Sequence, residues 1–95
     1  MIEGFQEWFN KNLSNLERCG IVIAVSEPTR EPLRNSIAAT AKSDNHEALI
    51  CLWETGECAV DVGDFRRSEV DSFNYEFHSR EDLSVFLETF FAKFD

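Results

Sequence analysis

The chain has 95 residues, of which 18 are acidic and 9 are basic, so its formal net charge at pH 7 is −9. This length suits one domain, and a hydrophobic content of 43%, with nine phenylalanines, is enough for one core. An acidic surface repels nucleic acid and anionic membranes and attracts basic protein surfaces. Composition therefore predicts a single domain over residues 1–95 that binds another protein, with neither nucleic acid nor membrane as a partner.

The N-terminal segment has the pattern of an amphipathic helix. Trp8 widens an apolar stripe that recurs with the helical period at Ile2, Phe5, Phe9, Leu13 and Leu16. Gly20 predicts the end of this helix, and the β-branched run over residues 20–26 predicts the first strand. After a proline-containing loop, weak alternation over residues 34–42 predicts a second strand.

The middle of the chain reads as a hairpin. Residues 47–53 are apolar on both faces, as expected for a central strand, and residues 58–64 are its return strand. Residues 54–57 form the predicted turn, in which Gly56 is free to adopt a positive φ. This hairpin is also the start of the most acidic part of the chain, so it is the first place to look for a binding surface.

The C-terminal third predicts one more strand and a second helix. Residues 72–77 alternate, with Phe73, Tyr75 and Phe77 on one side. Residues 79–82 resemble a capping box, with a serine three positions before an acidic residue. A broad apolar helical stripe follows, made of Leu83, Phe86, Leu87, Phe90, Phe91 and Phe94. Such a stripe has to cover a large apolar surface, most simply one face of the sheet.

The resulting order is α-β-β-β-β-β-α, which predicts an α+β fold. We expect an antiparallel sheet of about five strands, with the N-terminal and C-terminal helices packed on one face. Pairing of Trp53 with Cys58 would place Ile50, Leu52, Ala59 and Asp61 on one face and Leu49, Cys51, Val60 and Val62 on the other. We expect the Asp61 side to be open, although a change of one residue in turn length would exchange these sets.

The cysteines and histidines show no pattern typical of a catalytic or metal site. The three cysteines, Cys19, Cys51 and Cys58, include no C-x2-C pair, and the two histidines lie at unrelated positions. No apolar run approaches the roughly 20 residues that cross a bilayer, and the acidic N-terminus is unlike a secretory signal. We therefore expect a cytoplasmic protein with reduced thiols and no catalytic residue, metal or cofactor. A small enzyme that uses carboxylates on the open face remains the weaker hypothesis.

Five residues of the acidic hairpin and its return strand are the predicted partner-binding site: Trp53, Glu54, Glu57, Asp61 and Asp64. Tryptophan is a frequent interface anchor, and an acidic rim suits a basic partner. Trp53 has a second interpretation, in which it closes the end of the core beside the last helix.

The hairpin sequence over residues 52–62 resembles the W-E-x-G-E-C segment of the TriTu immunity proteins. The ending from Tyr75 to Leu83 with its phenylalanine-rich helix, and the opening helix with Phe5, Trp8 and Phe9, are similar to that family as well. The resemblance implies a non-enzymatic inhibitor of a TreTu-type toxin, carried on a secreted bacterial Rhs effector. Such toxins are ADP-ribosyltransferases that use NAD to modify elongation factor Tu.

The resemblance also implies how the inhibitor works. A 1:1 complex would place the acidic surface in a basic cleft of the toxin, at its active or NAD-binding site. Two alternatives stay open on the residues alone. One is an acidic secretion chaperone that holds an effector in an extended state, and the other is an immunity protein against a nuclease or deaminase toxin.

Overall fold

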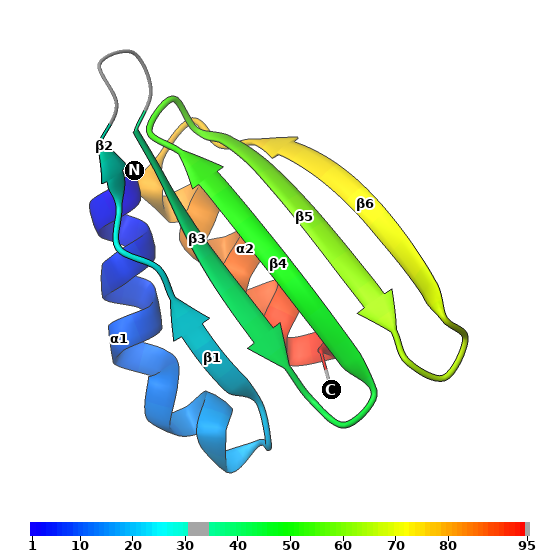
Figure 1. The fold of residues 1–95 in the computed structure, drawn as a ribbon. Helices are drawn as coiled ribbons and strands as arrows, with labels where there is room; N and C mark the ends of the chain where they lie inside the picture. Colours follow the sequence, from blue (N-terminus) through cyan, green and yellow to red (C-terminus); the bar gives the residue numbers. More distant parts are fainter. Residues whose placement is uncertain (31–34, 95) are drawn as a thin grey trace.

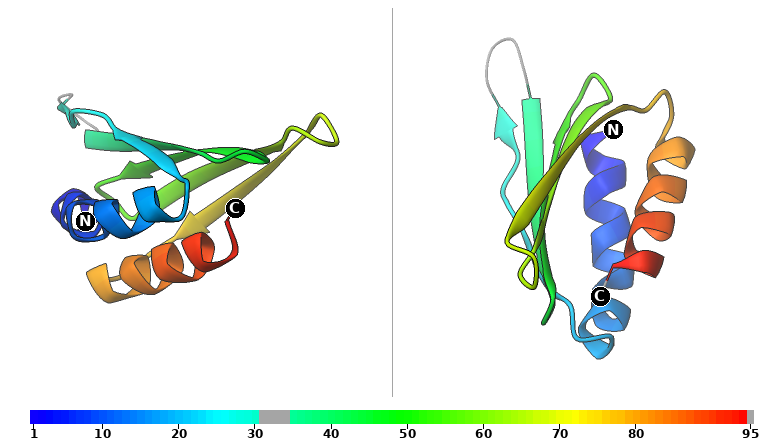
Figure 2. Two further views of the ribbon diagram at one scale, coloured as in Figure 1. Left: turned by 90° about the horizontal axis from the view of Figure 1, so that it is seen from below. Right: turned by 90° about the vertical axis from the view of Figure 1, so that its right-hand side faces the viewer.

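One antiparallel sheet covered on one face by two helices makes up the computed structural model, which describes residues 1–30 and 35–94 (Figure 1). In chain order the elements are α1 (Ile2–Arg18), β1 (Val22–Val25), β2 (Thr29–Arg30), β3 (Asn35–Lys42), β4 (His46–Trp53), β5 (Glu57–Asp64), β6 (Glu69–Glu76) and α2 (Arg80–Lys93). Figure 2 shows α1 and α2 side by side in one layer, with the twisted sheet as the other layer. The predicted α+β fold is therefore confirmed.

The strands follow the spatial order β1-β3-β4-β5-β6, and every pairing is antiparallel. The two-residue β2 also pairs with β3 and continues the edge that β1 begins. Val25 pairs with Ala39 but Thr29 pairs with Ser36, so this edge carries one extra residue between β1 and β2. The interruption contains Pro28, which has no N–H to donate to a neighbouring strand.

The two helices bury their apolar stripes against the sheet and against each other. Trp8 of α1 stacks on Phe91 of α2 with ring centroids 5.6 Å apart, and Phe9 meets the same ring edge-on at 5.7 Å. The predicted cap of α2 is confirmed, because the Ser79 hydroxyl accepts a hydrogen bond from the Asp82 N–H at 3.1 Å. Leu13 departs from the predicted stripe, since it is 37% exposed.

The β4–β5 hairpin differs by one residue from the predicted register. Leu52, rather than Trp53, pairs with Cys58, so the loop comprises residues 54–56. Within it Gly56 has a φ of +98°, and its N–H donates to the Trp53 carbonyl at 2.9 Å. A three-residue loop that ends in a left-handed residue is a common hairpin connection, and it is one residue shorter than the predicted turn.

This shorter loop inverts the predicted faces of β4. Ile50 and Leu52 were predicted on the open side, but both are fully buried under the helices. They share this buried face with Val60. Leu49 and Cys51, predicted on the core side, lie on the other face, where Leu49 pairs with Asp61 and Cys51 pairs with Ala59. The assignment of the β4 side chains was therefore wrong, while the expectation that the Asp61 side is open is confirmed.

Trp53 follows the same alternation. It comes directly after the buried Leu52 and pairs with Ser36, so it lies on the face away from the helices. The interpretation in which Trp53 closes the core beside the last helix is therefore wrong. Of the two cysteines in this hairpin, Cys58 is buried and Cys51 is only partly buried, on the open side.

Candidate partner-binding surface

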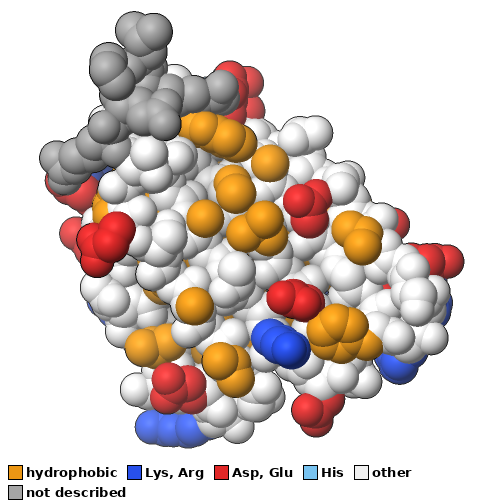
Figure 3. All heavy atoms as spheres, viewed as in Figure 1, with side chains coloured by type: hydrophobic (Ala, Val, Ile, Leu, Met, Phe, Trp, Pro, Cys, Tyr) orange, Lys and Arg blue, Asp and Glu red, His pale blue; other side chains and the backbone are white. Residues whose placement is uncertain are grey.

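The sheet face that the helices leave uncovered is the candidate binding surface, and we call it the open face. Strand register assigns to it Ser36, Ala38, Thr40 and Lys42 of β3, Glu47, Leu49, Cys51 and Trp53 of β4, Glu57, Ala59, Asp61 and Gly63 of β5, and Val70, Ser72, Asn74 and Glu76 of β6. This set contains four carboxylates and a single lysine. Figure 3 views the open face directly and shows apolar side chains gathered over the middle of the sheet with carboxylates among them.

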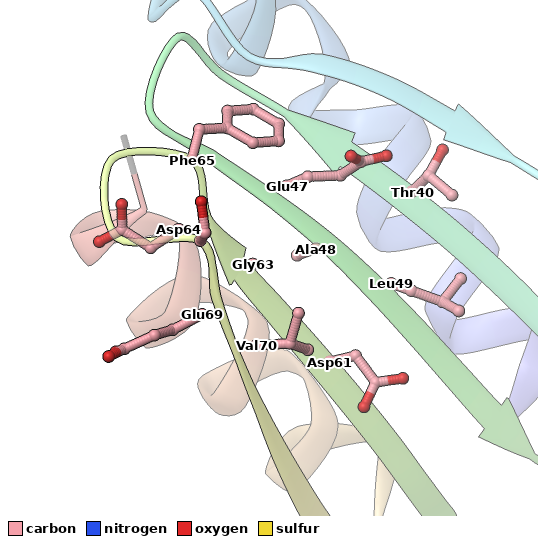
Figure 4. Close-up of a pocket in the computed structure, with 11 residues that line it drawn as sticks. Thr40, Glu47, Ala48, Leu49, Asp61, Gly63, Asp64, Phe65, Glu69 and Val70 are labelled. Carbon is pink, nitrogen blue, oxygen red and sulfur yellow. The ribbon is translucent and has the colours of Figure 1, made fainter.

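A shallow hollow of about 520 Å³ lies on this face, between β4, β5 and the start of β6. Its apolar lining comes from Leu49, Phe65 and Val70, which are 38%, 47% and 69% exposed. The carboxylates of Glu47 and Asp61 lie at its margin (Figure 4). An exposed apolar centre with a charged rim is the usual arrangement of a protein–protein interface.

Asp61 is oriented on the open face by a hydrogen bond from β6. The Ser72 hydroxyl donates to Asp61 Oδ1 at 2.6 Å, across a pair that the β5–β6 register places side by side. Burial, and then the negative charge of Asp61, raise the pKa of the Cys51 thiol. Burial raises the pKa of Cys58 to about 12. Both thiols are therefore protonated at neutral pH, which makes them poor nucleophiles.

Trp53 and Glu57 occupy the hairpin end of the open face. Glu57 pairs with Glu76 of β6, so two carboxylates lie next to each other there. Together with Ala59 and Asn74 they line a second hollow, of about 540 Å³, that Trp53 borders. Of the five predicted site residues, these two and Asp61 therefore share one surface.

Glu54 instead binds the start of α1. The Ile2 N–H donates to Glu54 Oε2 at 3.0 Å, and the Met1 amino group lies 3.1 Å from Oε1. The hydrogen bond from Ile2 is the main reason why the pKa of Glu54 is lowered. A carboxylate at a helix N-terminus satisfies free N–H groups and interacts favourably with the helix dipole. Glu54 therefore fastens the hairpin loop to α1, while its side chain stays 51% exposed.

Asp64 organises the loop after β5. It is 7% exposed and accepts hydrogen bonds from the Arg66 N–H at 2.9 Å and from Arg67 Nε at 3.1 Å. His46 Nε2 lies 3.5 Å away. Burial raises the pKa of Asp64, but the hydrogen bonds and charges of Arg66 and Arg67 outweigh it and lower the pKa to about 2. Asp64 thereby holds the loop that carries Phe65 into the hollow.

The lowered pKa of Asp64 predicts how stability depends on pH. Because the folded-state pKa of about 2 lies below the ordinary aspartate pKa of 3.8, the ionised carboxylate stabilises the fold above pH 4. That contribution is lost as the pH falls from 4 through 2. The Tm difference between the wild type and Asp64→Asn, from thermal unfolding at pH 2–7, should therefore be largest above pH 4 and narrow towards pH 2. Glu69→Gln, which removes another carboxylate near Arg67, at 3.6 Å, is the matched control. Equal narrowing in both variants would contradict this role of Asp64.

The apolar residues of the hollow, Leu49, Phe65 and Val70, were missed at the level of sequence. The face on which Leu49 lies depends on the hairpin register, and the predicted register was wrong by one residue. Phe65 did carry a usable signal, because it is a lone aromatic residue at the start of a polar, charged loop. Loops run over the surface and carry a large share of binding residues.

The described part of the chain offers neither a cluster of metal-binding side chains nor a membrane-spanning helix. Residues 1–30 and 35–94 contain no group of three or more histidine, cysteine or acidic side chains placed to hold a metal ion. Neither α1 nor α2, the helices of these two described ranges, is long and apolar enough to cross a membrane. The arrangement that stands out is an acidic face with an apolar centre.

Comparison with known proteins gives this surface a context. The family model described as "Immunity protein TriTu" matches residues 3–93, which is nearly the whole chain. A comparison with curated proteins gave no match. An immunity protein neutralises a toxin, and an open face suited to protein binding agrees with such a role. The chain therefore belongs to the TriTu family of immunity proteins.

Proposed function

We propose that this chain neutralises an ADP-ribosyltransferase toxin of the TreTu type by covering the toxin's active or NAD-binding site with the open face. Its membership of the TriTu family is the observation that carries the proposal. The toxin would be the domain of a secreted Rhs effector that modifies elongation factor Tu. Because that target works in translation, the immunity protein would act in the cytoplasm, as a 1:1 inhibitor.

Complementary charge is the physical reason why the open face would bind at the NAD site of the toxin. A site that binds the phosphate groups of NAD has to present positive potential, and an acidic surface competes for the same field. The chain has a formal net charge of −9, and the open face carries Glu47, Glu57, Asp61 and Glu76 against Lys42. Complementary charge of this kind raises the association rate and selects the partner. The apolar hollow then supplies the contact area that slows dissociation.

The five predicted site residues have distinct roles in this proposal. Glu57 and Asp61 are rim contacts to basic toxin side chains, and Trp53 is an anchor at the hairpin end. Glu54 keeps an exposed part of its carboxylate for the partner while it caps α1. Asp64 contributes by holding the Phe65 loop in place.

The test is to co-express the chain with the toxic domain encoded immediately upstream and to purify the complex. Light scattering gives the stoichiometry, and incubation of the free toxin domain with NAD and elongation factor Tu gives the activity. We expect a 1:1 complex. We also expect the free toxin domain to label elongation factor Tu in the presence of NAD, and the complex not to label it. A tight complex with a toxin that lacks NAD-dependent activity would overturn the toxin class, and a nuclease or deaminase would then be sought.

A third outcome would overturn neutralisation itself. A dimer of this chain that binds an extended effector segment, and leaves the folded toxin domain active, would identify a secretion chaperone. In that case the acidic surface would not serve to inhibit a toxin.

A further inference from the structure

The outer side of β6 is one edge of the sheet. Among residues 1–30 and 35–94, β6 pairs only with β5, over all eight of its residues. The opposite edge of the sheet is different, because Pro28 and an extra residue interrupt it between β1 and β2. Natural sheets commonly protect their edges by such interruptions. This chain therefore protects one edge and leaves the other long and regular.

The ladder identifies which backbone groups of β6 point outwards. In an antiparallel pair, alternate residues exchange hydrogen bonds with the neighbouring strand. Next to the hairpin loop, the Phe77 N–H donates to the Gly56 carbonyl at 2.8 Å, which aligns the odd-numbered residues of β6 with β5. The even-numbered residues therefore direct their N–H and C=O groups away from the sheet: Val70, Ser72, Asn74 and Glu76.

An aromatic groove borders the same strand on the helix side. It has a volume of about 350 Å³ and lies between α2 and the strands β5 and β6. Tyr75 and Phe86 pack against each other in its wall with ring centroids 4.7 Å apart, and Phe90 continues the row 5.8 Å from Phe86. Phe73 and Tyr75 remain 45% and 38% exposed. Figure 2 shows why, since the sheet extends past the helix layer on the β6 side.

We propose that β6 accepts an extended segment of the toxin as an additional strand, with apolar side chains of that segment in the aromatic groove. This inference rests on the proposed function and names the contact within it. Addition of a strand to a free edge uses backbone hydrogen bonds for affinity and pockets for alternate side chains for selectivity. The open face and the groove meet at β6, so one partner can cover the first and reach over the edge into the second.

Charge selects the occupant. β6 contains Glu69, Asp71 and Glu76 and no lysine or arginine, and Arg67 balances one of these charges from 3.6 Å. A second copy of this chain would bring another three carboxylates and another net charge of −9. A segment with lysine or arginine between apolar residues matches both the edge and the groove. The occupant is therefore a basic partner rather than a second copy.

Amide hydrogen exchange of the wild-type chain tests this directly. The ¹⁵N-labelled chain is measured free and in complex with the toxic domain encoded upstream. We expect the amides of Val70, Ser72, Asn74 and Glu76 to exchange at least about tenfold more slowly in the complex, because each gains a backbone acceptor. The odd-numbered amides of β6 are already bonded to β5 and serve as the internal control.

A proline substitution gives a second, independent readout. Asn74→Pro removes an outward N–H without removing a bond to β5, a position at which edge strands tolerate proline. Asn74→Ala removes the same side chain but keeps the N–H. Because Asn74 lies on the open face, Asn74→Ala measures the effect of losing its side chain, and we expect Asn74→Pro to raise the Kd for the toxin domain at least about tenfold above that of Asn74→Ala. Circular dichroism verifies that both variants fold, and the exchange experiment does not depend on either.

The outcomes separate the two proposals. Formation of an inhibited complex in which the four amides keep their free exchange rates would overturn strand addition and leave the neutralising function intact. Absence of any complex would overturn both. Slow exchange of the same four amides in the free chain, together with a dimer by light scattering, would assign the edge to a second copy and overturn the toxin segment as its occupant.

Discussion

A chain with Glu57→Lys and Asp61→Lys is expected to bind the toxin domain at least about 30-fold more weakly than the wild type, a loss of about 2 kcal/mol. Both carboxylates lie on the open face, and Asp61 is held there by the Ser72 hydroxyl at 2.6 Å. Their reversal places positive charge against a basic partner. Part of the loss should appear as slower association at low salt, because steering charges act chiefly on that rate.

The matched control is Glu17→Lys with Glu88→Lys. Both residues are exposed, on α1 and α2, and the pair changes the net charge by the same amount as the open-face pair. Calorimetry gives the affinity, and stopped-flow mixing at two salt concentrations gives the rates. We expect the control to reduce association modestly and to leave dissociation unchanged. Equal losses in the two variants would show that net charge alone matters and that the open face does not bind.

Replacement of Gly56 by alanine is expected to lower the free energy of unfolding by about 3 kcal/mol or more. Gly56 has a φ of +98°, which an L-residue adopts only with strain. A Cβ at this position would also overlap the carbonyl oxygen of Phe77, a backbone atom that cannot turn aside. Phe77 is held beside Gly56, because its N–H donates a hydrogen bond to the Gly56 carbonyl. Urea denaturation measures the change.

Gly20→Ala separates the two causes. Gly20 has a similar φ of +82°, but a Cβ there meets no atom within 4 Å among the described residues. In Gly20→Ala only backbone strain should act, and we expect the free energy of unfolding to fall by about 1 kcal/mol. If Gly20→Ala and Gly56→Ala proved equally destabilising, the close approach to Phe77 would not explain the requirement for glycine in the hairpin loop.

Much of the fold could be predicted because most segments have a single strong periodicity. The stripe from Ile2 to Leu16 and the capped phenylalanine-rich segment after Ser79 have the helical period, and both became helices. The alternating and β-branched runs became strands within a few residues of their predicted ends. Element order then restricts the architecture, since helices at both ends of a run of strands favour one two-layer arrangement.

The hairpin register could not be predicted in the same way. Residues 47–53 are apolar at nearly every position, so the sequence of β4 does not say which side chains face the helices. Loop length decides this, and a loop of three residues instead of four moves every side chain to the other face. The contrast with β5 is instructive, because its alternation of Val60 and Val62 with Ala59 and Asp61 did identify the core side.

The candidate site shows the same division between composition and geometry. Acidic character directed attention to the hairpin and its return strand, and the strand register places three of the five predicted residues, Trp53, Glu57 and Asp61, on the open face. Acidic character does not predict that Glu54 binds the start of α1 or that Asp64 binds the loop after β5. Both interactions join segments whose proximity is a property of the folded chain. An acidic residue in a sequence is therefore evidence for a binding surface only after its internal partners are known.

The measurement that tests the central claim most directly is a titration of NAD-dependent labelling of elongation factor Tu by the toxin domain. The wild-type chain and the Glu57→Lys/Asp61→Lys variant are added in increasing amounts to a fixed amount of toxin. We expect one equivalent of the wild type to remove most of the labelling, while the variant reaches the same inhibition only at a clearly larger amount. Equal inhibition by the two chains would contradict the claim that the open face neutralises the toxin.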